Sequence, residues 1–176
     1  MSGILRAWSL AALCLFTTAG ISADAAETLR GLTVRAAGRH RPVIIRHVRE
    51  GAASSSNWSG YAVTGSKGSV RDVTGSWVVP SVTCDSGTEY SSFWVGIDGF
   101  NSNTVEQIGT DSDCHGGAPA YYAWFEFYPH PMFTINNLPV QPGDLMSANV
   151  HYDPSSRQFT VTITNETAHQ SFSTST

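Results

Sequence analysis

Residues 158–164 read Gln-Phe-Thr-Val-Thr-Ile-Thr, and no other part of the chain indicates its fold class so clearly. The apolar side chains of Phe159, Val161 and Ile163 alternate one by one with threonines. A period of two residues is typical of a β-strand that has one face on a hydrophobic core and the other in solvent. The stretch therefore predicts one strand of an antiparallel sheet that covers a core on one side only.

Similar short runs, rich in Val, Thr and aromatic residues, occur on the N-terminal side of this stretch. Gly, Pro, Asn, Asp and Ser separate them, and these residues favour turns. No stripe of apolar residues with helical spacing follows residue 51. This pattern predicts an all-β fold, either an antiparallel sandwich or a barrel. The expected strands are residues 61–64, 70–79, 92–97, 105–108, 121–128 and 145–152.

On the C-terminal side, residues 171–176 read Ser-Phe-Ser-Thr-Ser-Thr and look like part of a strand. A sandwich that stops within a strand leaves an unpaired edge and half-covered faces. We therefore expect the β-fold of residues 1–176 to be incomplete at the C-terminus.

The first 25 residues have the parts of a secretory signal. Arg6 precedes an apolar run at residues 7–16, and Ala23-Asp24-Ala25 fits the small-residue pattern before a cleavage site. The alternative is a buried N-terminal helix. We expect residues 1–25 to be a signal peptide, which predicts secretion and no attachment to a membrane once it is removed.

Residues 26–53 differ in charge from the rest of the chain. Six Arg minus two Glu give +4 for residues 26–50, whereas three basic minus eleven acidic residues give −8 for residues 51–176. A basic leader before an acidic body suggests a propeptide held partly by charge, or else a linker. Residues 54–176 would be the folded domain, and its negative charge argues against nucleic-acid binding.

The cysteines predict one disulfide bond. Cys14 would leave with the signal peptide, so Cys84 and Cys114 remain as a pair in a secreted protein. The closed loop of about thirty residues would contribute about 3 to 4 kcal/mol of stability. A metal site is disfavoured, because Cys114-His115 lacks a second closely spaced pair of ligands.

Four short motifs of aromatic and polar residues follow one another along residues 54–176. A tryptophan beside a glycine belongs more often to a core than to a site, so no single motif is decisive. Their order and spacing resemble those of the glutamic peptidases (eqolisins, peptidase family G1) over about residues 57–170. The motifs are Asn57-Trp58-Ser59-Gly60-Tyr61, Trp94-Val95-Gly96-Ile97-Asp98-Gly99, Glu106-Gln107-Ile108-Gly109-Thr110 and Ala123-Trp124-Phe125-Glu126-Phe127-Tyr128-Pro129.

The resemblance implies an all-β, lectin-like sandwich of two antiparallel sheets, with a cleft across a concave face and a catalytic Gln/Glu pair. The Gln of the family's Q-x-G segment falls on Gln107, which would then be catalytic. Trp58, Trp94, Asp98 and Glu126 match positions expected to line or support the substrate cleft. A polypeptide substrate, hydrolysis at acid pH and no cofactor are implied, and we expect a monomer.

The chain departs from the family at the catalytic Glu, which the resemblance places in an A-E-[WF] segment. Residues 1–176 contain no such segment. Glu106 is adjacent to Gln107 and should point to the opposite face of a strand. We therefore expect this chain to be inactive because it lacks the general base. The rival interpretation is a non-catalytic sandwich that binds peptide or glycan through its tryptophans.

Two N-x-[ST] sequons are present, at Asn57 and Asn165. The first lies inside a family motif, where chance is the simpler explanation. The second lies on an expected turn and could carry a glycan if the source is eukaryotic.

Overall fold

The computed structural model describes residues 11–12, 34–36, 46–49 and 52–176, and side chains from Ser55 onward. The predicted signal peptide and most of the predicted basic segment lie outside these residues. No helix occurs in the described part of the chain, and therefore none that could cross a membrane. The strands are β1 (Ala11–Ala12), β2 (Val34–Ala36), β3 (Arg46–Arg49), β4 (Ala52–Ser54), β5 (Ala62–Val63), β6 (Asp72–Val78), β7 (Thr88–Glu89), β8 (Ser92–Asp98), β9 (Val105–His115), β10 (Ala118–Tyr128), β11 (Phe133–Ile135), β12 (Leu145–Asp153), β13 (Gln158–Asn165) and β14 (Gln170–Ser175).

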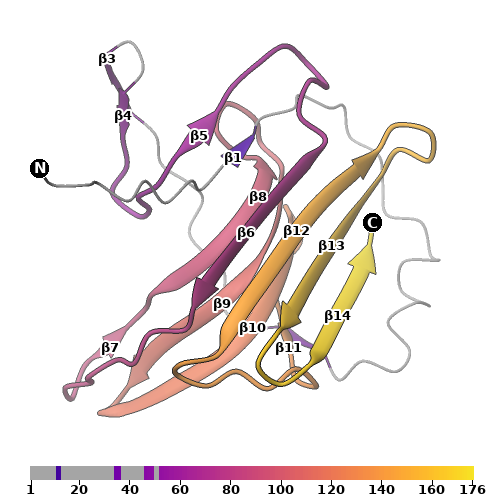
Figure 1. Cartoon of the computed structure of the whole chain (residues 1–176). Helices are drawn as coiled ribbons and strands as arrows, with labels where there is room; N and C mark the ends of the chain where they lie inside the picture. The colour runs from indigo at the N-terminus through magenta and orange to yellow at the C-terminus, as the bar shows by residue number, and fades with distance from the viewer. Residues whose placement is uncertain (1–10, 13–33, 37–45, 50–51) are drawn as a thin grey trace, which may run out of the picture.

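The strands form a two-layer sandwich, which confirms the predicted fold class (Figure 1). One sheet has the order β2-β11-β10-β9-β8-β1-β5, with β7 paired to β9, and the other has the order β14-β13-β12-β6. The pairs from β6 to β14 are antiparallel, whereas β1 pairs in parallel with β8 and β5. A separate ladder joins β3 and β4.

Strand β13 behaves as its alternation predicts. Phe159, Val161 and Ile163 are buried, and the intervening threonines are partly exposed. Its buried face joins those of β6, β12 and β14 in a core closed from the other side by β8, β9 and β10. Phe125 of β10 stacks on Phe172 of β14 with ring centroids 5.5 Å apart, so the aromatic contact joins the two layers.

Strand β9 is longer than the sequence predicts. The expected segment was residues 105–108, but the strand continues to His115 and pairs with β10 along its whole length. Asp111, Ser112 and Asp113 normally favour turns because their side chains compete for backbone hydrogen bonds. Here the two Asp carboxyls have partners on neighbouring segments, so the backbone stays in the ladder. The extra length carries the acidic cluster described below.

Candidate active site

The two faces of the β8-β9-β10 sheet have different chemistry. Val95, Ile108 and Phe125 lie on the face that meets the core. Alternation turns their neighbours to the opposite face, where three cross-strand rows follow one another. The rows are Gly96–Gln107–Glu126, Trp94–Gly109–Trp124 and Ser92–Asp111–Tyr122. Most of the residues selected from the sequence are therefore on one face.

Gln107 and Glu126 form the centre of this arrangement. They are direct partners in the β9–β10 register, and Nε2 of Gln107 donates to Oε2 of Glu126 at 2.6 Å. Gln107 is 6% exposed and Glu126 is 3% exposed. The pairing places a neutral amide against a buried carboxyl group. Hydrogen bonds that involve an ionised group are about twice as strong as neutral ones.

The two predicted tryptophans lie next to this pair. Trp58 and Trp94 are in edge contact, with ring centroids 6.2 Å apart. Gly96 lies between Trp94 and Gln107, since a Cβ atom added to Gly96 would lie 3.0 Å from Cβ of Gln107 and 3.3 Å from Cζ3 of Trp94. A larger residue at position 96 would push the indole away from the amide. The structure therefore brings Trp58, Trp94, Gln107 and Glu126 together.

Asp98 lies at the end of β8 and is 6% exposed. Its φ of 70° is in the left-handed region, which is uncommon for a residue with a side chain. Glu106, its near neighbour on β9, is 8% exposed, and its Oε2 has no hydrogen-bond partner. Burial raises the pKa of Glu106 to about 8, and the negative charge of Asp98 contributes to the rise. Register places Glu106 and Gln107 on opposite faces, as expected.

An acidic cluster of Ser92, Asp111, Asp113, Tyr122 and Trp124 adjoins the Gln107 row. Asp111 and Asp113 are 1% and 0% exposed. Asp111 accepts hydrogen bonds from Ser92 and from Nε1 of Trp124, the latter at 2.6 Å. The Tyr122 hydroxyl lies 2.9 Å from Oδ2 of Asp111 and 2.6 Å from Oδ2 of Asp113.

The Tyr122 hydroxyl has one hydrogen for two carboxyl oxygens, so a second proton completes both contacts. Burial raises the pKa of Asp113, while the hydrogen bond from Tyr122 lowers it and the charge of Asp111 raises it again. Burial and the same carboxyls also raise the pKa of Tyr122. A protonated Asp113 can donate to the Tyr122 oxygen while Tyr122 donates to Asp111. The cluster is therefore best satisfied under acidic conditions.

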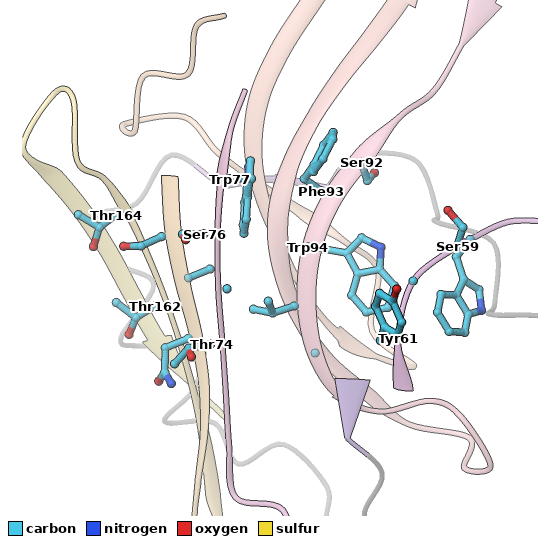
Figure 2. A pocket seen from close by; sticks show the side chains of 18 residues that line it. Ser59, Tyr61, Thr74, Ser76, Trp77, Ser92, Phe93, Trp94, Thr162 and Thr164 are labelled. Carbon is cyan, nitrogen blue, oxygen red and sulfur yellow. The ribbon is translucent and has the colours of Figure 1, made fainter. Parts of the chain in front are cut away.

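A groove of about 950 Å³ lies beside the tryptophans (Figure 2). Residues 58–61 and β8 contribute Trp58, Tyr61, Phe93 and Trp94, and strands β6, β12 and β13 contribute mainly Ser, Thr and Asn side chains. Asp, Glu, Lys, Arg and His are all missing from the eighteen residues of this lining. Gln107, Asp98 and Glu126 are not part of the lining, although Gly96, the partner of Gln107, is. The groove therefore approaches the amide from the Gly96 side.

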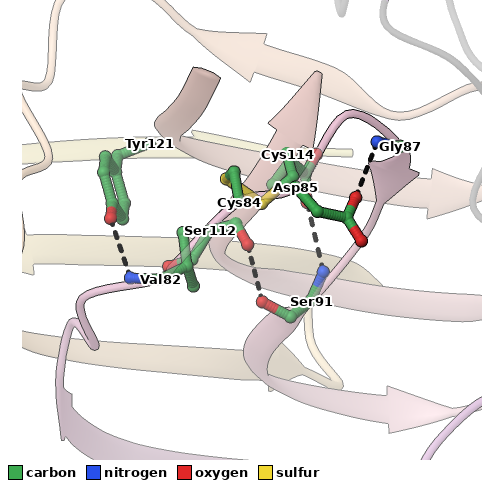
Figure 3. Close-up of a disulfide and its surroundings, with 9 residues drawn as sticks. Val82, Cys84, Asp85, Gly87, Ser91, Ser112, Cys114 and Tyr121 are labelled. Atoms are coloured by element: carbon green, nitrogen blue, oxygen red, sulfur yellow. Dashed lines mark hydrogen bonds between the residues drawn. A yellow bond between two sulfur atoms is a disulfide. The ribbon is translucent and has the colours of Figure 1, made fainter. Parts of the chain in front are cut away.

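The predicted disulfide between Cys84 and Cys114 is present, with the Cα atoms 5.4 Å apart (Figure 3). It ties the loop after β6 to the end of β9. Neighbouring bonds hold the segment between β6 and β8, since Tyr121 Oη accepts from the Val82 amide and the Ser91 amide donates to Asp113. The disulfide thus stabilises the end of the sheet that carries the acidic cluster.

Sequence reasoning missed Asp111, Asp113 and Tyr122, which lie on the same face of the sheet as Gln107. One signal was available: the two Asp alternate with Ser112 at a period of two, directly after the Gln107 motif. No group of three or more His, Cys, Asp and Glu side chains in the described residues is arranged to hold a metal ion.

Comparison with known proteins gives three matches. The Peptidase A4 family profile matches residues 56–176. Aspergillopepsin-2 of Aspergillus niger is 31% identical over 168 aligned residues, which take in 77% of this chain and 59% of that protein. The chain is also similar to the crystal structure of scytalido-glutamic peptidase with a transition state analog inhibitor, with a TM-score of 0.53 and 29% identity over 60% of this chain and 49% of that chain. The chain thus spans less than two thirds of either relative.

Proposed function

Because the chain belongs to the Peptidase A4 family, we propose that its sandwich is built for acid hydrolysis of polypeptides, with Gln107 as the catalytic amide. The observation that carries the proposal is the position of Gln107, buried against Glu126 and separated from Trp94 only by Gly96. The tryptophans would hold the substrate beside this amide. Asp98, at the end of β8, and Glu126, near the end of β10, would support the cleft.

The proposed chemistry follows from what a peptide bond needs. Water that attacks the carbonyl carbon must lose a proton to a base, and the oxygen that becomes negative needs a donor. A carboxylate base contributes about 10²- to 10⁴-fold to the rate, and one oxyanion donor contributes about 10²- to 10³-fold. The second N–H of Gln107 would serve as that donor. An amide stays neutral in acid, so Gln107 would keep both N–H groups at the acid pH at which the peptidase would work.

We further propose that residues 1–176 alone do not hydrolyse peptides. The family resemblance assigns the general base to an A-E-[WF] segment, which this sequence does not contain. Among the described carboxyls, Glu126 is bonded to the amide itself and Glu106 faces away from it. The chain would bind its polypeptide substrate through the groove and leave it intact.

The cellular setting is part of the same proposal. Residues 1–25 would direct secretion, and the +4 charge of residues 26–50 would attract them to the −8 body as a propeptide. A monomer acting on polypeptide, without membrane attachment after signal removal, completes the hypothesis.

The test is to express the full chain and to incubate it with an acid-denatured protein and with a labelled uncharged peptide. We expect no hydrolysis above background, together with peptide binding that changes tryptophan fluorescence and is weakened by Trp94→Ala. Hydrolysis that Gln107→Ala abolishes would place the base within residues 1–176, and Glu126 would be the first candidate. If the chain shows no hydrolysis and also no peptide binding, the proposal is refuted.

The lining of the groove also favours a second candidate, a non-catalytic glycan-binding module. Aromatic rings beside Ser, Thr and Asn side chains suit a neutral sugar as well as a neutral peptide. Titration with neutral oligosaccharides separates the two. Saturable sugar binding that peptides do not displace would favour the glycan-binding module over the peptidase.

A further inference from the structure

We infer that Glu126 is the positioning residue for Gln107, and that it decides which end of the Gln107 amide faces the reacting peptide. The inference rests on the proposed catalytic role of Gln107. The observation behind it is the bond of 2.6 Å from Nε2 of Gln107 to Oε2 of Glu126.

Within the β8–β9–β10 ladder, one neighbouring side chain can hold the Gln107 amide. Its partners in the ladder are Gly96 on β8 and Glu126 on β10. Gly96 has no side chain with which to hold the amide, and its backbone lies so close that an added Cβ would come within 3.0 Å of Cβ of Gln107. Glu126 is therefore the ladder neighbour whose side chain can fix the orientation of the amide. Because both side chains are buried, water competes weakly for the bond.

The chemistry of the two groups makes the orientation unique as long as Glu126 is ionised. A side-chain amide has an acceptor end and a donor end of nearly the same shape, and its last torsion rotates easily. An ionised carboxylate only accepts, so the NH₂ end of Gln107 must face it. The second N–H and the carbonyl oxygen are then directed away from Glu126, where they can hold an oxyanion or a water molecule. Exchange of the two ends would put a lone pair where the donor is needed.

Two substitutions of similar volume separate this role from packing. Glu126→Gln can donate as well as accept, so it permits both orientations of Gln107. Glu126→Met fills the space but neither holds the NH₂ end nor offers a strong acceptor. Glu89→Gln, on the exposed strand β7, is the matched control for loss of one carboxylate.

The experiment is NMR of the full chain labelled with [¹⁵N]glutamine. Gln107 is the buried one of four glutamines, since Gln141, Gln158 and Gln170 are exposed, and Gln107→Ala identifies its side-chain signals. We expect these signals to exchange slowly with solvent in the parent chain and in Glu89→Gln. Glu126→Met should speed the exchange by at least about tenfold, and Glu126→Gln should shift or double the signals. Backbone amides of Ile108 and Phe125 should stay protected, which distinguishes lost positioning from a damaged sheet.

A second measurement links position to function. The affinity of the full chain is compared for a peptide and for the same peptide with a phosphinic group in place of one amide bond. Gln107→Ala should weaken binding of the tetrahedral analogue by about 10²-fold, and Glu126→Met by about tenfold, with little change for the parent peptide.

The outcomes separate the two ideas. Analogue binding that does not respond to Gln107→Ala, or is absent from the parent chain, contradicts the proposed role of Gln107. If Gln107→Ala weakens the analogue but neither Glu126 variant changes the Gln107 signals or the analogue affinity, the positioning role is wrong. If Glu126→Met does not fold, the signals and affinity of Glu126→Gln decide alone.

Discussion

The carboxyl groups of Glu106 and Asp98 are buried near one another at the end of the β8–β9 pair, where charge on Asp98 opposes charge on Glu106. Neither side chain contributes to the hydrophobic core. Oε2 of Glu106 has no partner, and Asp98 has left-handed backbone. Such a site is tolerated when Glu106 carries a proton, because a neutral carboxyl is cheaper to bury than a carboxylate.

The stability of the fold should therefore fall as the pH rises. The pKa of Glu106 is raised from 4.5 to about 8 in the folded chain. The stabilisation from its protonated form is fully present below 4.5 and is lost as the pH rises through about 8. We expect the free energy of unfolding to drop over this range by on the order of a few kcal/mol, measured by urea denaturation at a series of pH values.

Glu106→Gln tests the cause of that drop. The amide stays neutral, so the variant should lose most of the pH dependence while unfolding similarly in acid. Glu89→Gln, which removes an exposed carboxylate, should keep the parent profile. Identical profiles for the parent chain and Glu106→Gln would show that another group controls the loss.

Strands β13 and β9 show which parts of the fold the sequence predicts and which it does not. The alternation of Phe159, Val161 and Ile163 predicted both a strand and its buried face, because a period of two has one geometric solution on a pleated sheet. Residues 109–113 on β9 alternate too, but Asp111 and Asp113 alternate with Ser112, so no apolar face marks them as a strand. Their place in the ladder depends on bonds to Tyr122, Trp124 and Ser91, which lie 9 to 22 residues away in the sequence. Local propensity cannot report partners of that kind.

The candidate site likewise has residues that the sequence identified and contacts that only the structure shows. Family motifs selected Gln107, Trp58, Trp94, Asp98 and Glu126 by position. Only the register of β8, β9 and β10 shows that Glu126 is the hydrogen-bond partner of Gln107. The motifs likewise say nothing of Asp113, whose contact with Tyr122 requires the full length of β9.

A hydrogen bond between the sheets gives the second prediction. Nε1 of Trp77 on β6 donates to Oγ1 of Thr110 on β9 at 2.8 Å, and Thr110 is 1% exposed. Thr110→Val keeps the shape but removes the acceptor, so the indole N–H loses this partner. We expect a loss of about 1 to 3 kcal/mol in unfolding free energy.

Thr110→Ser is the control for that change. It retains the hydroxyl and removes a methyl group, so it should lose about 1 kcal/mol through packing alone. A Thr110→Val variant more stable than Thr110→Ser in urea denaturation would show that the cross-sheet bond contributes little.

The disulfide gives the third prediction. Cys84 and Cys114 are 30 residues apart and close a loop that includes β7 and β8. Closing a loop of that length contributes about 3 to 4 kcal/mol by restricting the unfolded chain. The Cys84→Ala/Cys114→Ala variant should therefore melt well below the parent. It should also melt at the same temperature with and without reductant, whereas reduction should lower the melting temperature of the parent. A parent chain whose two thiols alkylate without prior reduction would contradict the bond itself.

The last prediction concerns Asn165, whose sequon suggested a possible glycan. The structure buries Asn165 completely, at 0% exposure. Its Nδ2 donates to the Pro139 carbonyl at 3.0 Å and to Oδ2 of Asp144 at 2.7 Å, and its Oδ1 accepts from the Ala168 amide at 2.9 Å. Both N–H groups are thus in use, and a sugar on Nδ2 would displace the turns that they hold. A chain secreted from a yeast host should carry no glycan at Asn165, while the exposed Asn57 is open to modification.

Intact mass before and after endoglycosidase treatment of the parent, Asn57→Gln and Asn165→Ala chains decides the question. The Asn57→Gln chain should carry no glycan mass, and the Asn165→Ala chain should carry as much glycan mass as the parent. Asn165→Ala should instead lower the free energy of unfolding by about 2 to 4 kcal/mol, because the Asp144 carboxyl, the Pro139 carbonyl and the Ala168 amide all lose their bonds to this buried side chain. Thr167→Ser keeps both the sequon and the hydroxyl that accepts from the Leu145 amide, so it should behave like the parent. Glycan recovered on Asn165 of a folded chain would mean that this side chain is accessible and that the three bonds around it do not hold the turn.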